Sequence, residues 1–152
     1  MKLNHPPVTA SGMLIRRPCE EVYEAFINPE ITSRFWFTHS SGRLDGEDEI
    51  IWKWGMYGVT TPVKVRYLHR NEKIIIDWGD PAITVEWTFV SRSDDMTFVE
   101  IRSSGFAGNA DESVAAAIDT ADGFALVLSG AKLWLERGLL SDFIGDRHPD
   151  GI

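Results

Sequence analysis

The chain has only one cysteine, Cys19, in 152 residues. A single cysteine excludes an internal disulfide, and this composition is typical of proteins from a reducing compartment. Basic residues are also scarce, because 15 Lys and Arg stand against 23 Asp and Glu and give a formal net charge of -8. Nucleic acids and anionic membranes bind proteins largely through basic side chains. We therefore expect neither a nucleic acid nor a membrane as a partner.

Long apolar runs are missing as well. No uninterrupted apolar run reaches the roughly 18 residues that a membrane span needs, and the N-terminal "MKLNHPPVTASG" lacks the apolar stretch of a signal peptide. These absences predict a cytoplasmic protein. The length fits one domain over residues 1–152, in which folding buries roughly 70% of the surface. Residues 141–152 are expected to form a loose tail.

Motifs for metals, cofactors and covalent catalysis are absent from the sequence. His5, His39, His69 and His148 form neither an HExxH motif nor a close pair, and Cys19 has no CxxC partner. Neither a GxGxxG motif nor a Walker-type phosphate loop occurs. The sequence therefore predicts no metal ion and no cofactor.

The order of secondary structure is easier to predict. An extended segment over residues 8–17 precedes a helix that starts after Pro18, and Asn28 with Pro29 starts a second short helix. Period-two alternation then indicates about six strands, and the sequence is helical again before Leu139, as one helix or as two divided near Gly123. This order favours an α+β fold, in which a curved antiparallel sheet of about six to seven strands wraps around a long C-terminal helix.

Two motifs resemble a known superfamily. The first is "RRPCEEVYEAFINPEITSRFWF", and the second is Gly123 and Phe124 followed by "LVLSGAKLWLERG". Together they resemble the START-like superfamily, also called SRPBCC or helix-grip proteins after the birch-pollen allergen, and most closely its homologues of the activator of the heat-shock-protein-90 ATPase. Many relatives have Trp where this chain has Phe124, and the segment 107–122 is longer than expected. The resemblance implies a cavity between the sheet and the long helix.

Aromatic residues are the main candidates for the lining of that cavity. In "RFWF" we expect one ring in the core, one over the cavity mouth and one at the surface. Large aromatics also fill cores, since each buries roughly 150–250 Å², and this alternative stays open. A ligand site should offer at least about 300 Å³. The predicted lining residues are Phe35, Trp36, Phe37, Trp52, Trp54, Tyr67, Trp78, Trp87, Phe124 and Leu128.

Three functions are compatible with these features. The first is binding of a small hydrophobic or aromatic ligand in the cavity, without chemistry of its own. The second is a cofactor-free enzyme of the cyclase, aromatase or hydrolase kind, which would need polar groups to converge inside; the candidates are Arg34, His39, Tyr57, Tyr67 and Asp77. The third, implied by the family name alone, is a module that regulates a chaperone ATPase in a stress response.

The long helix also bears on self-association. Leu126 and Leu133 fall on its otherwise polar side. Exposed leucines there would suit a partner surface such as that of a homodimer, although isolated exposed leucines are common in monomers.

Overall fold

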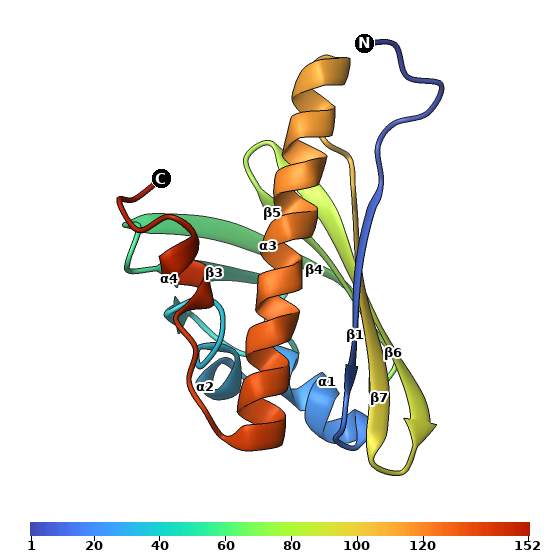
Figure 1. Ribbon diagram of the computed structural model, residues 1–152, viewed down its shortest axis with the longest axis vertical. Coiled ribbons are helices and arrows are strands. Elements are labelled where there is room, and N and C mark those ends of the chain that lie inside the picture. The colour runs from blue at the N-terminus through green and yellow to red at the C-terminus, as the bar shows by residue number, and fades with distance from the viewer.

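The computed structural model describes residues 1–152 and contains one seven-stranded sheet and four helices (Figure 1). The strands are β1 (Thr9–Ile15), β2 (His39–Ser40), β3 (Glu49–Trp54), β4 (Val59–His69), β5 (Lys73–Gly79), β6 (Ala82–Ser93) and β7 (Met96–Ser104). The helices are α1 (Cys19–Ile27), α2 (Pro29–Thr32), α3 (Ala110–Arg137) and α4 (Phe143–Arg147).

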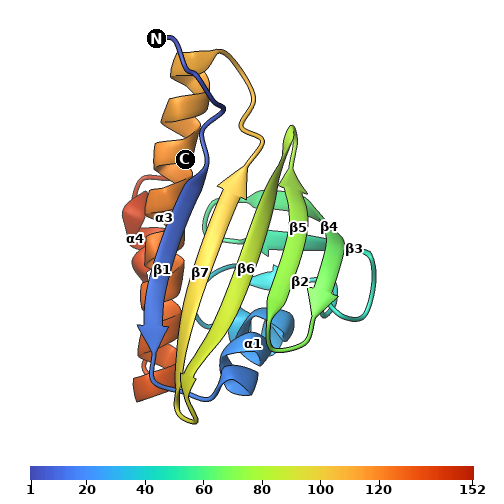
Figure 2. The ribbon, with the colours of Figure 1, turned by 90° about the vertical axis from the view of Figure 1, so that its right-hand side faces the viewer.

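All neighbouring strands are antiparallel, in the order β1-β7-β6-β5-β4-β3-β2 (Figure 2). The long helix α3 packs along β1 and β7 on one face of this sheet, and α1 packs on β6 and β7. A strand, two short helices, further strands and a long helix therefore follow one another as the sequence indicates. The helix-grip α+β fold is confirmed.

The two short helices are fixed by local capping. The Asn28 side chain accepts a hydrogen bond from the Glu30 N–H, and Pro29 occupies the first position of α2. The buried Thr32 hydroxyl donates to the Ala25 carbonyl, which ties α2 to α1. The sequence pattern extends this helix to Trp36, but the regular helix ends at Thr32 and the chain continues as turns.

Helix α3 is one unbroken helix of 28 residues. Asn109 and Glu112 form a reciprocal capping box at its start, and Gly138 ends it with φ of 64°. The segment 107–122, which is longer than expected from the resemblance, is therefore helical from Ala110 onward. Gly123 does not divide the helix, although a glycine inside a helix costs about 1 kcal/mol relative to alanine.

By length and composition alone, α3 could cross a membrane, because an 18-residue window reaches a mean hydropathy of 1.4. The same helix supplies Phe124, Val127 and Leu128 to the core, where each is at most 3% exposed. Amphipathic packing of this kind is typical of the core helix of a globular domain. We therefore assign α3 to the domain core.

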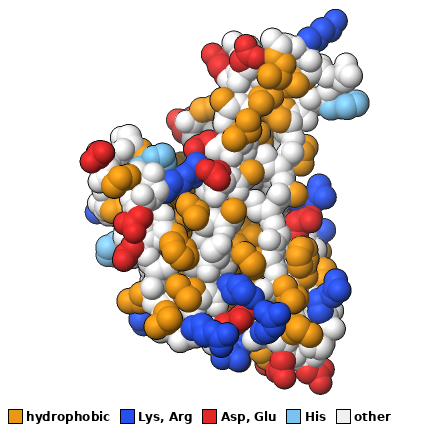
Figure 3. All heavy atoms as spheres, in the orientation of Figure 1, with side chains coloured by type: hydrophobic (Ala, Val, Ile, Leu, Met, Phe, Trp, Pro, Cys, Tyr) orange, Lys and Arg blue, Asp and Glu red, His pale blue; other side chains and the backbone are white.

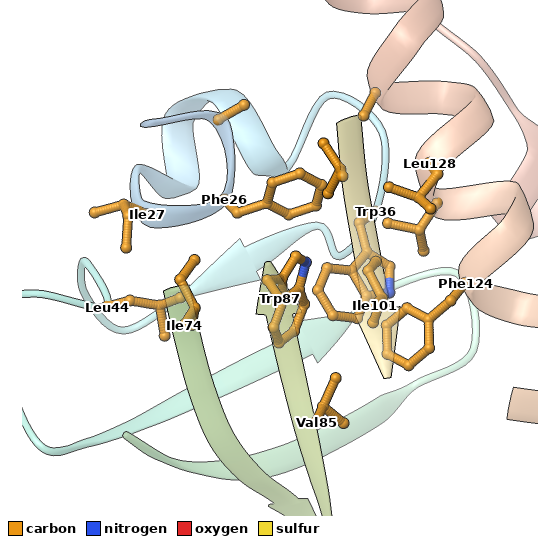
Figure 4. Close-up of a cluster of buried hydrophobic side chains, with 14 of the residues drawn as sticks. Phe26, Ile27, Trp36, Leu44, Ile74, Val85, Trp87, Ile101, Phe124 and Leu128 are labelled. Atoms are coloured by element: carbon orange, nitrogen blue, oxygen red, sulfur yellow. The ribbon is translucent and has the colours of Figure 1, made fainter. Parts of the chain in front are cut away.

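Trp36 lies at the centre of an aromatic core (Figure 4). Its ring centroid lies 4.8–6.0 Å from those of six other rings, a range typical of favourable aromatic pairs. These six rings belong to Phe37, Trp52, Trp54, Trp78, Trp87 and Phe124. Side chains thus fill most of the space between sheet and helices.

All three rings of "RFWF" are buried, so the prediction that one lies at the surface is wrong. Phe35 packs edge-on against Phe26, and Phe37 stacks on Trp52 with ring centroids 4.9 Å apart. This is possible because residues 33–38 follow no regular helix or strand, and their side chains can point in three inward directions.

A register shift in β4 changes the face on which Tyr67 lies. The pairing of β4 with β5 is irregular between Val65 and Tyr67. Val63 is buried before this shift, whereas Tyr67 is 48% exposed and Leu68 packs against the core after it. The prediction that Tyr67 faces inward is wrong, because a bulge reverses the alternation of a strand.

The expected loose tail is folded back onto the domain. Helix α4 lies beside α3 (Figure 1), and Ile144 packs against the hydrophobic core. The Tyr57 hydroxyl, in the turn between β3 and β4, donates a hydrogen bond to the Ile144 carbonyl. The contact joins residues 87 positions apart, so the local sequence of the tail does not predict it.

A buried carboxylate joins the end of β1 to the last turns of α3. Glu136 has a side chain only 8% exposed, and its Oε2 accepts hydrogen bonds from the Arg16 N–H and the Lys132 ammonium, at 2.8 and 2.7 Å. Figure 3 shows Lys and Arg side chains gathered over this end of α3. Burial alone would raise the pKa of Glu136, but the hydrogen bonds and cations lower it further than burial raises it.

Glu136→Gln is expected to lower the free energy of unfolding at neutral pH by roughly 1.5–3 kcal/mol, since hydrogen bonds to a charged group are lost. A carboxylate with a lowered folded-state pKa stabilises the protein above its unfolded pKa of about 4.3, and this contribution is lost as the pH falls. Urea unfolding from pH 7 to pH 3 should show a steeper loss of stability below about pH 5 for the wild type than for the variant. Glu47→Gln, at an exposed loop position, is the control. Parallel pH curves for wild type and Glu136→Gln would contradict the prediction.

Candidate functional site

A pocket of about 240 Å³ lies between β3, β4, β5, the middle of α3 and the C-terminal segment. Five of its lining residues are Trp, Tyr or Phe, and four of them lie together: Trp36, Trp54, Trp78 and Phe124. The ring of Trp78 lies 5.5–5.9 Å from each of the other three, measured between centroids, so the four rings form a continuous surface. We call this surface the aromatic floor.

The mouth of the pocket is polar. Arg147, from the end of α4, places Nη2 2.6 Å from an oxygen of Asp119 and 3.3 Å from an oxygen of Asp122, both on α3. The Arg147 side chain is 20% exposed, whereas the two carboxylates are largely exposed. In Figure 3 basic, acidic and histidine side chains lie close together between α4 and α3. The neutral hydroxyls of Thr61 and Thr120 complete this rim.

Gly123 explains how Arg147 comes so close to α3. A Cβ atom at position 123 would lie 2.9 Å from Nη1 of Arg147, which is closer than real Cβ atoms approach other atoms. The glycine that weakens the helix therefore leaves room for the guanidinium. This pairing gives a structural reason for a glycine in the interior of α3.

The C-terminal segment covers one side of the pocket. Ile144, His148 and Ile152 all contribute to the lining. The ring of Tyr57 meets that of His148 edge to face, with centroids 6.0 Å apart, and its hydroxyl bonds to the carbonyl of Ile144. Tyr57 thus holds the segment to the turn between β3 and β4.

The predicted lining residues divide between this pocket and the packed core. The structure brings Trp36, Trp54, Trp78 and Phe124 to the pocket and leaves Tyr67 exposed on the opposite face. The pocket is smaller than the expected 300 Å³, because aromatic side chains occupy much of the interior. The remaining predicted residues, which lie in the core away from the pocket, are Phe35, Phe37, Trp52, Trp87 and Leu128.

Of the predicted polar groups, only Tyr57 lies at the pocket. Arg34 is exposed, with its guanidinium carbon 4.9 Å from the ring centroid of Trp134. His39 is exposed on β2, with Nδ1 3.1 Å from the hydroxyl of the adjacent Thr38. These side chains do not converge on one reacting centre.

Asp77 lies on the outer face of the sheet. Its carboxylate accepts hydrogen bonds from Arg66 at 2.5 Å and from the Thr84 hydroxyl at 2.7 Å. Burial would raise the pKa of Asp77, but these two partners lower it below its ordinary value. A wider hollow of about 470 Å³ lies beside it, bordered by charged side chains such as Glu49 and Lys64. Such a surface lacks the apolar lining of most small-molecule sites.

Several pocket residues were not among the predicted ones. Asp119 lines the pocket, and Asp122 lies beside it on the same face of α3, three positions later. Their place at the pocket depends on Arg147, which pairs with both and lies 28 residues beyond Asp119. His148 came from a segment expected to be loose. Gly123 was the available signal, since a glycine inside a helix often marks a close approach. No group of three or more His, Cys, Asp or Glu side chains is arranged to hold a metal ion.

Comparison with known proteins supports the resemblance seen in the sequence. No curated protein matches the chain. A solved protein of Staphylococcus saprophyticus is 25% identical, with a TM-score of 0.78 over 89% of this chain and 96% of that one. The Aha1 dimer of Colwellia psychrerythraea (18% identity, TM-score 0.71) covers 87% of this chain and 98% of its own. A START superfamily protein of Mycobacterium smegmatis (14%, 0.62) covers 84% and 98%.

The family comparison covers most of the fold. The model of the family described as "Activator of Hsp90 ATPase homolog 1-like protein" matches residues 16–130, from the end of β1 into α3. The match includes the three rings of "RFWF" and the Gly123 and Phe124 pair. It covers more than half of the chain, and the solved relatives share the fold. The chain therefore belongs to the Activator of Hsp90 ATPase homolog 1-like family.

Proposed function

We propose that this protein binds a small apolar or aromatic molecule in the pocket beside α3, without chemistry of its own. The aromatic floor carries the proposal, because small-molecule sites are mostly apolar with a few polar groups that orient the ligand. At about 240 Å³ the pocket is below the roughly 300 Å³ expected of a typical ligand site, but it exceeds the roughly 150 Å³ in which an engineered apolar cavity binds benzene. The ligand therefore has the size of one ring or two.

The enzymatic alternative has less support. A catalytic site requires a nucleophile or base within hydrogen-bond reach of a group that orients it. Of the five polar side chains considered for this role, Tyr57 alone lines the pocket, and its hydroxyl already donates to a backbone carbonyl. The third function, regulation of a chaperone ATPase, rests on the family name, and no feature of the pocket bears on it.

Filling the pocket should abolish binding while leaving the fold intact. Thr61 lines the pocket from β4, whereas its neighbour Thr60 is exposed on the other face of the same strand. We expect Thr61→Trp to lose the bound molecule and Thr60→Trp to keep it, because only the first new ring enters the pocket. Native mass spectrometry of protein purified from its own host measures the extra mass.

The same variants can be titrated with indole, a small aromatic probe, and followed by amide chemical shifts. Shifts confined to the pocket in the wild type and in Thr60→Trp, and absent in Thr61→Trp, are the expected result. If the native protein carries no extra mass and indole at millimolar concentration leaves the pocket signals unmoved, the proposal is wrong. Circular dichroism of both variants checks that the fold is unchanged.

Self-association remains a separate prediction. Leu126 and Leu133, which suggested it, are both half-buried and do not form an exposed pair. The Colwellia relative is described as a dimer. At 18% identity, its likeness to this chain shows a shared fold and not a shared oligomeric state. Native mass spectrometry of the wild type reports monomer or dimer directly. The cytoplasmic location also remains a prediction.

A further inference from the structure

We propose that the ligand of this pocket carries a positively charged amine, which binds between the aromatic floor and the carboxylates of Asp119 and Asp122. This inference rests on the proposed function, because it assigns a ligand class to the same pocket. It follows from three features of the pocket: its rings, its charges and its size.

The rings favour a cation. The face of an aromatic ring carries negative charge density, and indole is the strongest common partner for ammonium groups. Three of the four floor rings are tryptophans: Trp36, Trp54 and Trp78. Trp36 and Trp54 are each 6% exposed, while Trp78 is only partly buried and offers more of its ring to a ligand. An ammonium group above Trp78 would keep contact with the aromatic floor.

The charges at the mouth point the same way. Asp119 and Asp122 lie on one face of α3, and one guanidinium, that of Arg147, faces both of them. Two carboxylates against one cation leave an excess of negative charge at this rim. Asp119 and Arg147 line the pocket, and Asp122 lies beside it through its ion pair with Arg147. The other polar groups of the lining are hydroxyls and the ring of His148. An ammonium group beside these carboxylates would meet opposite charge, whereas a ligand carboxylate would have only Arg147, which already pairs with both aspartates.

Long-range electrostatics and the size of the pocket further limit the chemical class of the ligand. The chain has a formal net charge of -8, so its field attracts cations and repels anions over distances of about a Debye length. A pocket of about 240 Å³ holds one aromatic ring and a short arm. A primary or methylated amine on a single ring, joined by one to three carbons, matches these limits.

Three probes of nearly equal size separate charge from shape: 2-phenylethylammonium, the neutral 2-phenylethanol and the anionic 3-phenylpropanoate. Isothermal titration calorimetry at low ionic strength, supported by amide shifts, measures their affinities. We expect the ammonium to bind about tenfold more tightly than the alcohol and the carboxylate to bind most weakly. The alcohol reports the aromatic contact that all three share.

Two variants test the origin of the preference. The double variant Asp119→Asn, Asp122→Asn should reduce the advantage of the ammonium over the alcohol to about twofold. Trp78→Leu keeps an apolar wall without a π face and should reduce the same ratio. The matched control is Asp94→Asn, Asp95→Asn, which removes two exposed charges from the turn between β6 and β7 and should leave the ratio unchanged. A general loosening of α4 would weaken the binding of the ammonium and of the alcohol alike, so the ratio of their affinities would not change.

The outcomes separate this inference from the proposed function. If the alcohol or the carboxylate binds as tightly as the ammonium, the pocket binds small aromatics but the inferred charge is wrong. If the control variant lowers the ratio as much as the Asp119 and Asp122 variant does, net charge and not this site produces the preference, and the inference is wrong. If none of the three binds at millimolar concentration, the inference fails together with the proposal of a small aromatic ligand.

Discussion

Trp36→Ala is expected to lower the free energy of unfolding by about 3–5 kcal/mol, the usual cost of removing a buried aromatic side chain. Trp36 is 6% exposed and joins rings contributed by the "RFWF" segment, the sheet and α3. Its removal leaves a cavity, because the surrounding rings come from different elements and cannot all move inward together. The loss would be a large part of the roughly 5–15 kcal/mol that typically stabilises a domain.

Urea unfolding followed by circular dichroism measures this effect. Tyr67→Ala is the matched control, since it deletes an aromatic side chain that is 48% exposed on the other face of the sheet, and it should cost less than about 1 kcal/mol. Trp36→Phe keeps a ring and should fall between the two. A loss below about 1 kcal/mol for Trp36→Ala would contradict the central position of this residue in the core.

The fold could be predicted because its elements follow local rules. Alternation in residues 82–90 predicts a strand with one buried face, and Val85, Trp87 and Phe89 are buried as expected. The helix stripe containing Phe124 and Leu128 likewise faces the core. A period of two or of 3.6 residues can be seen in the sequence itself. The buried face of such a strand or helix can therefore be predicted without knowing which element packs against it.

The pocket depends on features that have no local pattern. The bulge after Val65 turns Tyr67 outward, and a sequence with regular alternation does not reveal it. Arg147 reaches the pocket through ion pairs with residues 25 and 28 positions earlier, from a segment whose composition resembles a loose tail. Whether inward aromatic side chains line a cavity or fill a core depends on how they pack. The positions of the six tryptophans in the sequence do not specify this packing.

Gly130→Leu is expected to lower the free energy of unfolding by about 3 kcal/mol, at the upper end of the usual cost of overpacking. Gly130 is buried on α3, where the helix crosses the chain segment that carries Phe35. A Cβ atom at this position would already lie 3.0 Å from the Cβ of Phe35 and 2.9 Å from the hydroxyl of Ser141. Leucine is a good helix former, so the loss would arise from packing and not from helix propensity.

Ala125→Leu supplies the matched control, because it places the same side chain on the exposed side of the same helix. Its free energy of unfolding should stay within about 0.5 kcal/mol of the wild type. Thermal and urea unfolding of the two variants compare them directly. A stable Gly130→Leu protein would mean that α3 can move away from Phe35 at little cost. Since Phe35 precedes Trp36 in the chain, the aromatic floor would then be adjustable, and the pocket could admit ligands larger than about 240 Å³ allows.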